Sequence, residues 1–349
     1  MTLRDVAARA GVSTSTVARV LHRNGYVAEE TRARVEAAMR EGDFRLNAVA
    51  AGLKRRRTNT IGALLHETLP NPFFAEVALG IEHFANQHEH NVLLYNARGS
   101  AEHEGAGVDA LLSQQVEAIV FAKPVEAANV ERALEAGVAV VEVEKPLLRS
   151  AGSVLVDNYV GASAAMRHLL ELGHDHVGFI GEPSVTAPSG GEPVDRVVHE
   201  RFAAYRDALL NADLAIDESL VVLGAYHADA GWPRLRTGHD YMSRLLDQHP
   251  EVTAVFAASD LLAAGALQAL YERRVAVPDQ ASLIGFDDTY AQHLAPALTT
   301  VRQPMFEMGL EAATLALELA EERRAGVARE VWLDTELVVR DSTGEPKRD

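Results

Sequence analysis

The stretch GVSTSTVARVL, Gly11 to Leu21, decides the fold of the first part of the chain. It carries four consecutive hydroxyl side chains, and its apolar residues are Val17, Val20 and Leu21. Apolar residues three and four positions apart predict an amphipathic helix. One hydroxyl is enough to cap the N-terminus of a helix, so the others have either a local structural role or a partner to contact.

Helical patterns also flank this stretch. LRDVAARAG stops at Gly11, and AEETRARVEAAMREG stops at Gly42. Two short helices joined by a tight turn at Gly11 are typical of a helix-turn-helix, and a third helix closes its core. We expect the following side chains to face that core: Leu3, Val6, Ala7, Ala10, Val17, Val20, Leu21, Val35, Ala38 and Met39. The pattern therefore predicts that the first 57 residues are all-α.

Charge divides the chain at the same place. The formal net charge is −17, but residues 1–57 carry +6 and the remainder carries −23. A small basic domain on an acidic body is the asymmetry expected when only that domain meets phosphates. The KRRR cluster at Lys54–Arg57 supplies four of these positive charges, so it either contacts phosphates or forms a solvated linker.

The composition limits the classes of protein and site. A chain of 349 residues, 48% hydrophobic and 24% charged, is typical of a soluble protein of two or three domains. The absence of cysteine excludes disulfides and thiolate metal sites. We see neither a signal peptide nor an apolar run that would span a bilayer, so we expect a cytoplasmic location and no membrane partner.

From Thr60 onward, short apolar runs alternate with helical patterns. The expected strands are TIGALL, NVLLY, EAIVFA, VAVVEV, SVLV, HVGFIG, LVVLG, TAVFAAS and ASLIGF. The expected helices lie near 73–89, 104–115, 126–136, 158–172, 200–212, 238–248 and 260–274. This alternation predicts doubly wound parallel sheets, and the number of strands favours two α/β lobes. The Pro/Gly/Ser-rich residues 183–195 are expected to form a flexible insertion.

Several motifs together resemble the LacI/GalR family of bacterial transcription regulators. They are the whole stretch from Thr2 to Leu53, then NPFFAEVALGIE, VDNYVGASAAMRHLLELGHDHVGFIG, FAASDLLAAGAL, LIGFDD and LTTVRQPMFEMG, in that order. The resemblance implies a helix-turn-helix headpiece over 1–46, a hinge helix and linker over 47–58, and a two-lobed core over 59–349. That core would be similar to periplasmic sugar-binding proteins, and it would bind an effector and form a homodimer.

The resemblance assigns DNA contacts to the helix that opens at Ser13, the residue that we expect to cap it. Thr14 and Ser15 match positions that choose bases, and Thr16 matches a phosphate contact. Arg19 matches an arginine that reads guanine, a pairing that discriminates by about 1–3 kcal/mol. Further contacts are expected from His22, Asn24 and Tyr26. Without the resemblance, the same segment also fits a capped helix with an exposed arginine.

The hinge helix implied by the resemblance contains Asn47, Ala50 and Leu53. Leu53 matches a leucine that wedges into a base step of the minor groove, and Ala50 packs close to the groove or to the partner hinge. Two residues depart from the family pattern. Leu46 stands where proline is common, and Gly52 costs a helix about 0.5–1 kcal/mol relative to alanine. We therefore expect this helix to order on DNA.

The resemblance also implies an effector cleft where the strand ends of the two lobes meet. The matched positions are Phe73, Phe74, Glu144, Arg201, Ser259 and Asp287, with Tyr226 or Trp232 closing the pocket. Aromatic residues, an arginine and carboxylates suit a sugar or polyol, and a nucleobase or sugar acid stays open. Insertions near 184–195 and 226–236 are expected to shape the mouth of the cleft.

Other functions are weighed against this assignment. GxSxG and HExxH motifs are absent, so we expect no enzyme and no cofactor. The pairs His88–His90 and His174–His176 are expected to be surface or scaffold residues rather than metal ligands. A solute-binding protein would fit the body of the chain but not the headpiece. The preferred function is a repressor of carbohydrate-metabolism genes, with a transcription activator as the alternative.

Overall fold

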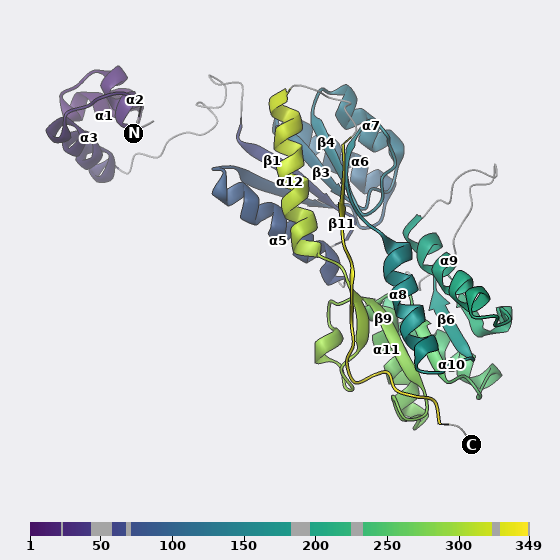
Figure 1. Cartoon of the computed structure of the whole chain (residues 1–349). Helices are drawn as coiled ribbons and strands as arrows, with labels where there is room; N and C mark the ends of the chain where they lie inside the picture. Colours follow the sequence, from purple (N-terminus) through teal and green to yellow (C-terminus); the bar gives the residue numbers. More distant parts are fainter. Residues whose placement is uncertain are drawn as a thin grey trace. The chain divides into compact units, whose positions relative to one another are not determined.

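The computed structural model describes residues 1–21, 24–42, 58–67, 71–182, 196–224, 233–322 and 329–347. The chain separates into two compact units, Met1–Thr58 and Asn59–Asp349 (Figure 1). The predicted hinge helix lies outside the described residues, and so do both insertions except residues 233–236. The same holds for six site residues: His22, Asn47, Ala50, Leu53, Tyr226 and Trp232.

The first unit contains three described helices, α1 (Leu3–Ala10), α2 (Thr14–Leu21) and α3 (Glu29–Glu41). Thr2 caps α1 in a capping box with Asp5, which satisfies two backbone N–H groups at the start of the helix. Gly11 ends α1 at a φ of 63°, a left-handed conformation that costs glycine little. This turn redirects the chain into α2, and the predicted helix-turn-helix is confirmed.

The core of this unit is small and apolar. Its fully buried side chains are Val6, Ala7, Ala10, Val17, Val20, Val35 and Ala38. Three further residues expected in the core, Leu3, Leu21 and Met39, are partly buried against it. The helical spacing therefore predicts the core correctly, because each helix buries one face only.

The second unit begins with a lobe built on a six-stranded sheet of order β11-β5-β4-β3-β1-β2, in which every pairing is parallel. Its strands are β1 (Thr60–Leu65), β2 (Asn91–Asn96), β3 (Ala118–Ala122), β4 (Ala139–Val143), β5 (Gly152–Val156) and β11 (Glu330–Leu333). We call this the first lobe. Strands β1, β3, β4 and β5 are buried along their whole length, as expected for parallel strands covered on both faces.

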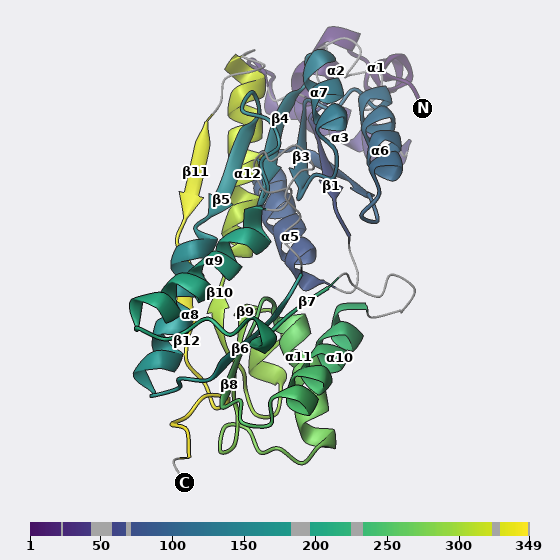
Figure 2. The same cartoon turned by 90° about the vertical axis from the view of Figure 1, so that its right-hand side faces the viewer.

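Two pairs of helices cover the sheet of the first lobe. Helices α5 (Pro72–Gln87) and α12 (Met305–Glu322) lie side by side on one face, and α6 (Ala101–Ser113) and α7 (Ala127–Glu135) belong to the other face (Figures 1 and 2). The backbones of α5 and α12 cross closely at two glycines. A Cβ on Gly80 would lie 2.0 Å from the Phe306 carbonyl oxygen, and a Cβ on Gly309 would lie 2.0 Å from that of Val77.

The second lobe repeats this design with a sheet of order β12-β10-β9-β8-β6-β7. Its strands are β6 (Val177–Gly181), β7 (Val221–Leu223), β8 (Ala254–Ala257), β9 (Ser282–Asp287), β10 (Thr299–Arg302) and β12 (Glu336–Val338). Its helices are α8 (Asn158–Glu171), α9 (Arg196–Asn211), α10 (Pro233–Gln248) and α11 (Asp260–Glu272), with short 3-10 turns η1 (Glu218–Leu220) and η2 (Ala291–His293). The edge strand β12 runs antiparallel to β10, which departs from the expected all-parallel sheet.

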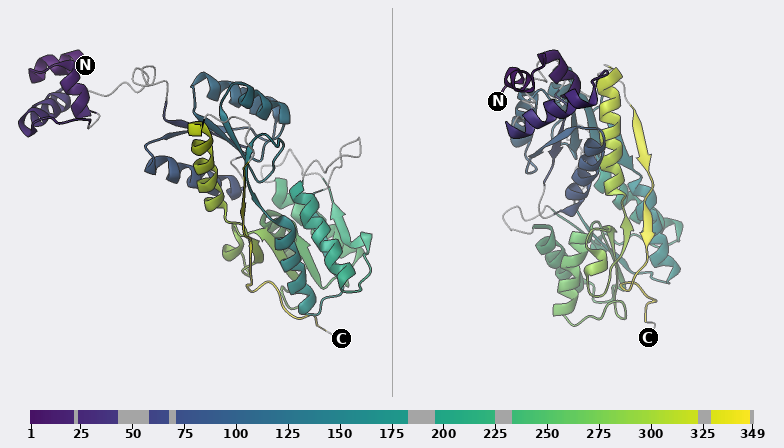
Figure 3. Two further views of the ribbon diagram at one scale, coloured as in Figure 1. Left: turned by 45° about the horizontal axis from the view of Figure 1, so that its top comes forward. Right: turned by 90° about the vertical axis from the view of Figure 1, so that its left-hand side faces the viewer.

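Within the described residues the chain passes between the lobes three times, after β5, after β10 and after β11 (Figure 3). The two-lobed α/β fold is therefore confirmed, and each of the nine expected runs holds a strand. Four further elements, α12, β10, β11 and β12, are not among the helices and strands expected from the sequence. Three of these follow the second and third passages, so they complete sheets that begin far away in the chain.

Candidate functional site

The first candidate site is the exposed start of α2. The Ser13 hydroxyl accepts a hydrogen bond from the Thr16 backbone N–H at 3.1 Å, so Ser13 caps the helix as expected. The same oxygen lies 2.7 Å from the Ser15 hydroxyl and 2.9 Å from the Thr16 hydroxyl. Three of the four hydroxyls thus form a local network around the cap, which orders the first turn of the helix.

The side chains expected to read DNA lie on the outside of this unit. Thr14, Ser15 and Arg19 are exposed, and Ser15 and Arg19 are four residues apart, which places them on one face of α2. Asn24 is exposed, and its backbone N–H bonds the Arg19 carbonyl at 3.1 Å. The Tyr26 side chain is 92% exposed. This surface therefore offers hydroxyl, guanidinium, amide and phenol groups to a partner.

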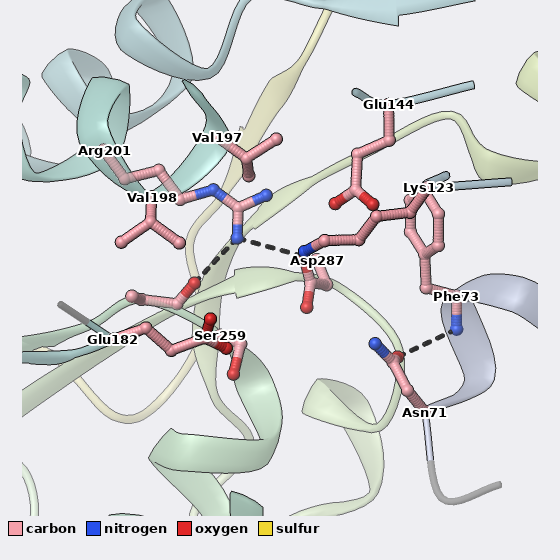
Figure 4. Close-up of a pocket in the computed structure, with 11 residues that line it drawn as sticks. Asn71, Phe73, Lys123, Glu144, Glu182, Val197, Val198, Arg201, Ser259 and Asp287 are labelled. Atoms are coloured by element: carbon pink, nitrogen blue, oxygen red, sulfur yellow. Dashed lines mark hydrogen bonds and ion pairs between the residues drawn. The ribbon is translucent and has the colours of Figure 1, made fainter. Parts of the chain in front are cut away.

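The second candidate site is a pocket between the two lobes, with about 450 Å³ of space that is open to solvent (Figure 4). Its lining residues are Asn71, Phe73, Lys123, Glu144, Glu182, Val197, Val198, Arg201, Ala258, Ser259 and Asp287. Most of them follow the carboxyl ends of β1, β3, β4, β6, β8 and β9, and the others belong to the first turns of α9. Open α/β sheets bind ligands at this edge.

Arg201 lies at the bottom of this pocket and is 5% exposed. Its Nε donates to Asn158 Oδ1 at 2.9 Å, and Nη1 donates to the Ala258 carbonyl at 2.7 Å. The guanidinium stacks 3.6 Å above the centre of the Phe286 ring. Nη2 is buried and has no hydrogen-bond partner among the described residues. A buried N–H without an acceptor is costly, so this nitrogen is well placed to bind an oxygen of a ligand.

Asp287 completes the charged floor of the pocket. Its Oδ1 lies 3.5 Å from Arg201 Nη1 and accepts a hydrogen bond from Gln303 Nε2 at 2.7 Å. Beneath it, the fully buried Asp260 accepts hydrogen bonds from the Thr300 hydroxyl and the Thr289 N–H. Burial first, and then the neighbouring Asp287 charge, raise the pKa of Asp260. Asp287 is thus the carboxyl group of this pair that lines the pocket, while Asp260 lies buried beneath it.

The first lobe supplies the opposite wall. Asn71 caps α5 by accepting the Phe73 N–H at 3.1 Å, which presents the Phe73 ring beside the pocket. Lys123 and Glu144 follow β3 and β4 at positive φ values of 58° and 71°. Their side chains extend toward the space between the lobes (Figure 4). An amide, an ammonium and a carboxylate therefore face Arg201 and Asp287 across the pocket.

Comparison with known proteins decides the family. Residues 2–47 match the model of bacterial regulatory proteins of the lacI family, and residues 166–343 match that of a periplasmic binding protein-like domain. The chain is 35% identical to the HTH-type transcriptional regulator DegA of Bacillus subtilis (strain 168), over 98% of each protein. The chain belongs to the lacI family. This member is therefore a DNA-binding transcription regulator.

Two further relatives place this lacI-family chain more closely. It is 31% identical to the HTH-type transcriptional repressor CytR of Escherichia coli (strain K12), over 98% of this chain and 96% of CytR. It also matches the solved complex of the transcriptional regulator CelR with cellobiose at a TM-score of 0.71 and 31% identity, over 98% of this chain and 99% of CelR. These relatives are transcription regulators and not enzymes.

The pocket brings together five of the residues that the family resemblance assigned to an effector: Phe73, Glu144, Arg201, Ser259 and Asp287. Phe74 does not line it. The Phe74 ring is 1% exposed in the core of the first lobe, packed edge-on against Phe73 and stacked on His66. Ser259 lines the pocket, but its hydroxyl also caps α11 by accepting the Leu262 N–H at 3.3 Å.

Sequence reasoning missed six lining residues of this lacI-family pocket: Asn71, Lys123, Glu182, Val197, Val198 and Ala258. A signal existed for two of them. Lys123 directly follows the run EAIVFA, and Glu182 directly follows HVGFIG, so both stand at the carboxyl ends of expected parallel strands. Val197 and Val198 carry no such signal, because they follow the insertion at 183–195.

Among the residues that the structure describes, no group of three or more His, Asp or Glu side chains is arranged to hold a metal ion. His174 instead serves the scaffold of the second lobe. Its Nδ1 lies 2.9 Å from the Thr253 hydroxyl, and its Nε2 lies 2.8 Å from the Gly344 carbonyl oxygen. No helix in the described parts of the chain is long and apolar enough to cross a membrane.

Proposed function

We propose that this lacI-family protein is a repressor of carbohydrate-metabolism genes, binds its operator as a homodimer, and is controlled by a sugar in the pocket between its lobes. The observation that carries the proposal is Arg201 Nη2. It is a buried guanidinium nitrogen without an acceptor, in a pocket whose floor also holds Asp287. The CytR name and the CelR–cellobiose complex support repression and a sugar effector.

Arg201 and Asp287 have complementary roles in this proposal. Arg201 donates from Nη2 to a sugar oxygen, and Asp287 accepts a hydrogen bond from a sugar hydroxyl. Phe73 packs against an apolar face of the ring, while Glu144 and Ser259 add polar contacts. A sugar suits this lining because it offers many hydroxyl groups that both donate and accept, together with apolar C–H faces.

The DNA contacts in this proposal come from α2 and the residues that follow it. Thr14, Ser15 and Arg19 enter the major groove, where a guanidinium pairs with guanine and hydroxyls contact either kind of base. Asn24 and Tyr26 contact the backbone, which positions the headpiece but reads no sequence. The roles of Thr16, His22 and the hinge residues Asn47, Ala50 and Leu53 remain proposals from the family resemblance.

A homodimer is supported by an exposed apolar face on the first lobe. Leu79 on α5 and Leu94 on β2 are 49% and 51% exposed, whereas Leu93, which is 37% exposed, points to the opposite side of β2. Leu79 and Leu94 border a groove that also contains Ala75, Ala78 and Val92. Water-exposed leucines around one groove are unusual on a monomer and typical of a protein interface. Pairing two such faces would bring two headpieces to one pseudo-palindromic operator.

The experiment tests ligand and DNA separately. Thermal unfolding is measured with cellobiose, ribose, other sugars, polyols, sugar acids and nucleobases, since a ligand of the folded state raises the midpoint. DNA selected from a random-sequence pool then gives an operator for titration with and without the ligand. We expect Asp287→Ala to abolish the thermal shift and retain operator binding, and the exposed-site control Asp279→Ala to retain both.

Three outcomes would contradict parts of the proposal. A pool that yields no preferred sequence would contradict operator binding. A shift with nucleobases but not with sugars would replace the effector class. If the ligand tightened operator binding and the bound protein increased transcription, the protein would be an activator and not a repressor.

A further inference from the structure

Glu142 is an unexpected residue for the centre of a parallel sheet. It lies on β4, whose sequence is AVVEV, and its side chain is fully buried. Side chains alternate along a strand, so Glu142 shares a face with Val140, which packs in the core beneath α6 and α7. A carboxylate is costly to bury without partners, so its surroundings deserve an explanation.

The partners of Glu142 lie in the loop that follows its own strand. Oε1 accepts a hydrogen bond from the Leu147 N–H at 2.9 Å, and Oε2 accepts one from the Leu148 N–H at 3.1 Å. The Glu144 N–H bonds the Val154 carbonyl, which fixes the start of the loop. The chain at Glu144, at a φ of 71°, is thus held from both sides while its side chain faces the pocket.

A second buried carboxylate holds the neighbouring loop in the same way. Glu104 on α6 is 2% exposed. It accepts the N–H groups of Val125 and Glu126 at 2.7 and 3.0 Å, and the Asn129 side chain at 3.0 Å. That loop begins at Lys123, the other charged pocket residue of the first lobe. Lys123 and Glu144 therefore each begin a loop whose backbone N–H groups donate hydrogen bonds to a buried glutamate.

We infer that Glu142 is a positioning residue of the effector pocket: its ionised carboxylate fixes the loop that presents Glu144, and proton uptake loosens that loop. The effector role of the pocket rests on the function proposed above. Charge-assisted hydrogen bonds are roughly twice as strong as neutral ones, so the Leu147 and Leu148 N–H groups are held best by the carboxylate.

The surroundings of Glu142 allow its side chain to gain or lose a proton near neutral pH. The charged groups that face it are Glu104 from α6 and Lys145 from the loop. Burial raises the pKa of Glu142 to about 7, while the two backbone N–H donors lower it. A raised pKa of an acid means that its contribution to global stability falls as pH rises from about 4.5 to 7. The Leu147 and Leu148 N–H groups lower the pKa of Glu142, so a loop opening that breaks these two bonds while the carboxyl stays buried is favoured by protonation. This local effect has the opposite sign to the global one.

Hydrogen–deuterium exchange on the full-length protein tests the inference without any ligand. Exchange of a peptide spanning residues 144–151 is measured at pH 6 and pH 8 and divided by the intrinsic rates. In the wild-type chain we expect protection of this peptide to be at least about fivefold higher at pH 8, because charge-assisted bonds are lost on protonation. In Glu142→Gln, which keeps the size of the side chain, we expect no pH dependence.

Glu104→Gln is the matched control. It should weaken protection of residues 123–126. Because the Glu104 charge helps to raise the pKa of Glu142, the 144–151 peptide should still be better protected at pH 8 than at pH 6, with the midpoint of the change moved to lower pH. Equal protection of that peptide at both pH values in the wild-type chain would overturn the inference, and this outcome needs no variant to fold. A pH dependence that persists in Glu142→Gln would also overturn it. Because the assay contains neither DNA nor effector, loss of operator binding would contradict the proposed function and not this inference.

Discussion

The two candidate sites are built in opposite ways. In the headpiece, the side chains that face a partner are exposed and adjacent in sequence, and the core beneath them is apolar. In the two-lobed unit, Arg201 and Asp287 are buried, come from distant segments, and belong to the packing of their lobe. We therefore expect that the residues proposed to face DNA can be replaced with little loss of stability, whereas replacement of Arg201 or Asp287 also disturbs the packing of their lobe.

The largest expected effect comes from Arg201→Ala. Removal of the guanidinium takes the ion-pair partner from buried Asp287 and the hydrogen-bond donor from Asn158 Oδ1, which should lower the free energy of unfolding by about 3–5 kcal/mol. Calorimetry of the two-lobed unit measures this. Arg206→Ala is the control, because Arg206 lies on the same helix, is 47% exposed, and should change stability by less than about 0.5 kcal/mol. Equal unfolding midpoints for the two variants would contradict the structural role of Arg201 in its lobe.

Gly80→Ala should have the next largest effect. The added methyl group meets the Phe306 backbone at 2.0 Å, so α5 and α12 must separate. Overpacking of this kind costs up to about 3 kcal/mol, and urea unfolding measures the loss. Glu76→Ala, on an exposed position of the same helix, serves as the control. Unchanged stability of Gly80→Ala would mean that the two helices do not pack through this glycine.

Arg19→Ala tests whether a residue proposed to face DNA can be replaced without loss of headpiece stability. Because Arg19 is exposed, headpiece stability should change by less than about 0.5 kcal/mol. Discrimination between operator variants should fall by about 2 kcal/mol at one base pair. Titrations of variant operators measure this, and Arg9→Ala, an exposed arginine on α1, should leave discrimination intact. Unaltered discrimination by Arg19→Ala would remove Arg19 from the base contacts.

Ser13→Ala tests a headpiece residue that is exposed but is also expected to contribute to stability. Its hydroxyl lies on the DNA-facing surface, yet it caps α2 and contacts two other hydroxyls. Loss of such a cap costs about 1 kcal/mol, which thermal unfolding of the headpiece should reveal. Thr14→Ala is the neighbouring control and should change stability by less than about 0.5 kcal/mol. If both variants were equally stable, the cap would contribute nothing.

Sequence reasoning succeeded where local spacing carries the information. The helical period assigned the headpiece core, and apolar runs assigned nine strands, because burial of one face or both faces leaves a repeating pattern. It failed for β11 and β12, which are four and three residues long and half exposed at sheet edges. Short length alone is not the reason, because β7 also has three residues and was assigned from the run LVVLG. Strands β11 and β12 each begin with a glutamate, and each pairs with a strand far away in the chain.

The sequence by itself determined the three-helix headpiece, the two-lobed α/β class and the exposed position of Arg19. These follow from neighbouring residues and their period. Only the tertiary structure decided that Phe74 belongs to the core, that Lys123 and Glu182 line the pocket, and that Glu142 clamps the loop of Glu144. The lining of the pocket depends on which strand ends meet across the lobes, and the positions of Phe74 and Glu142 depend on packing within the first lobe. Neither is set by the local sequence pattern.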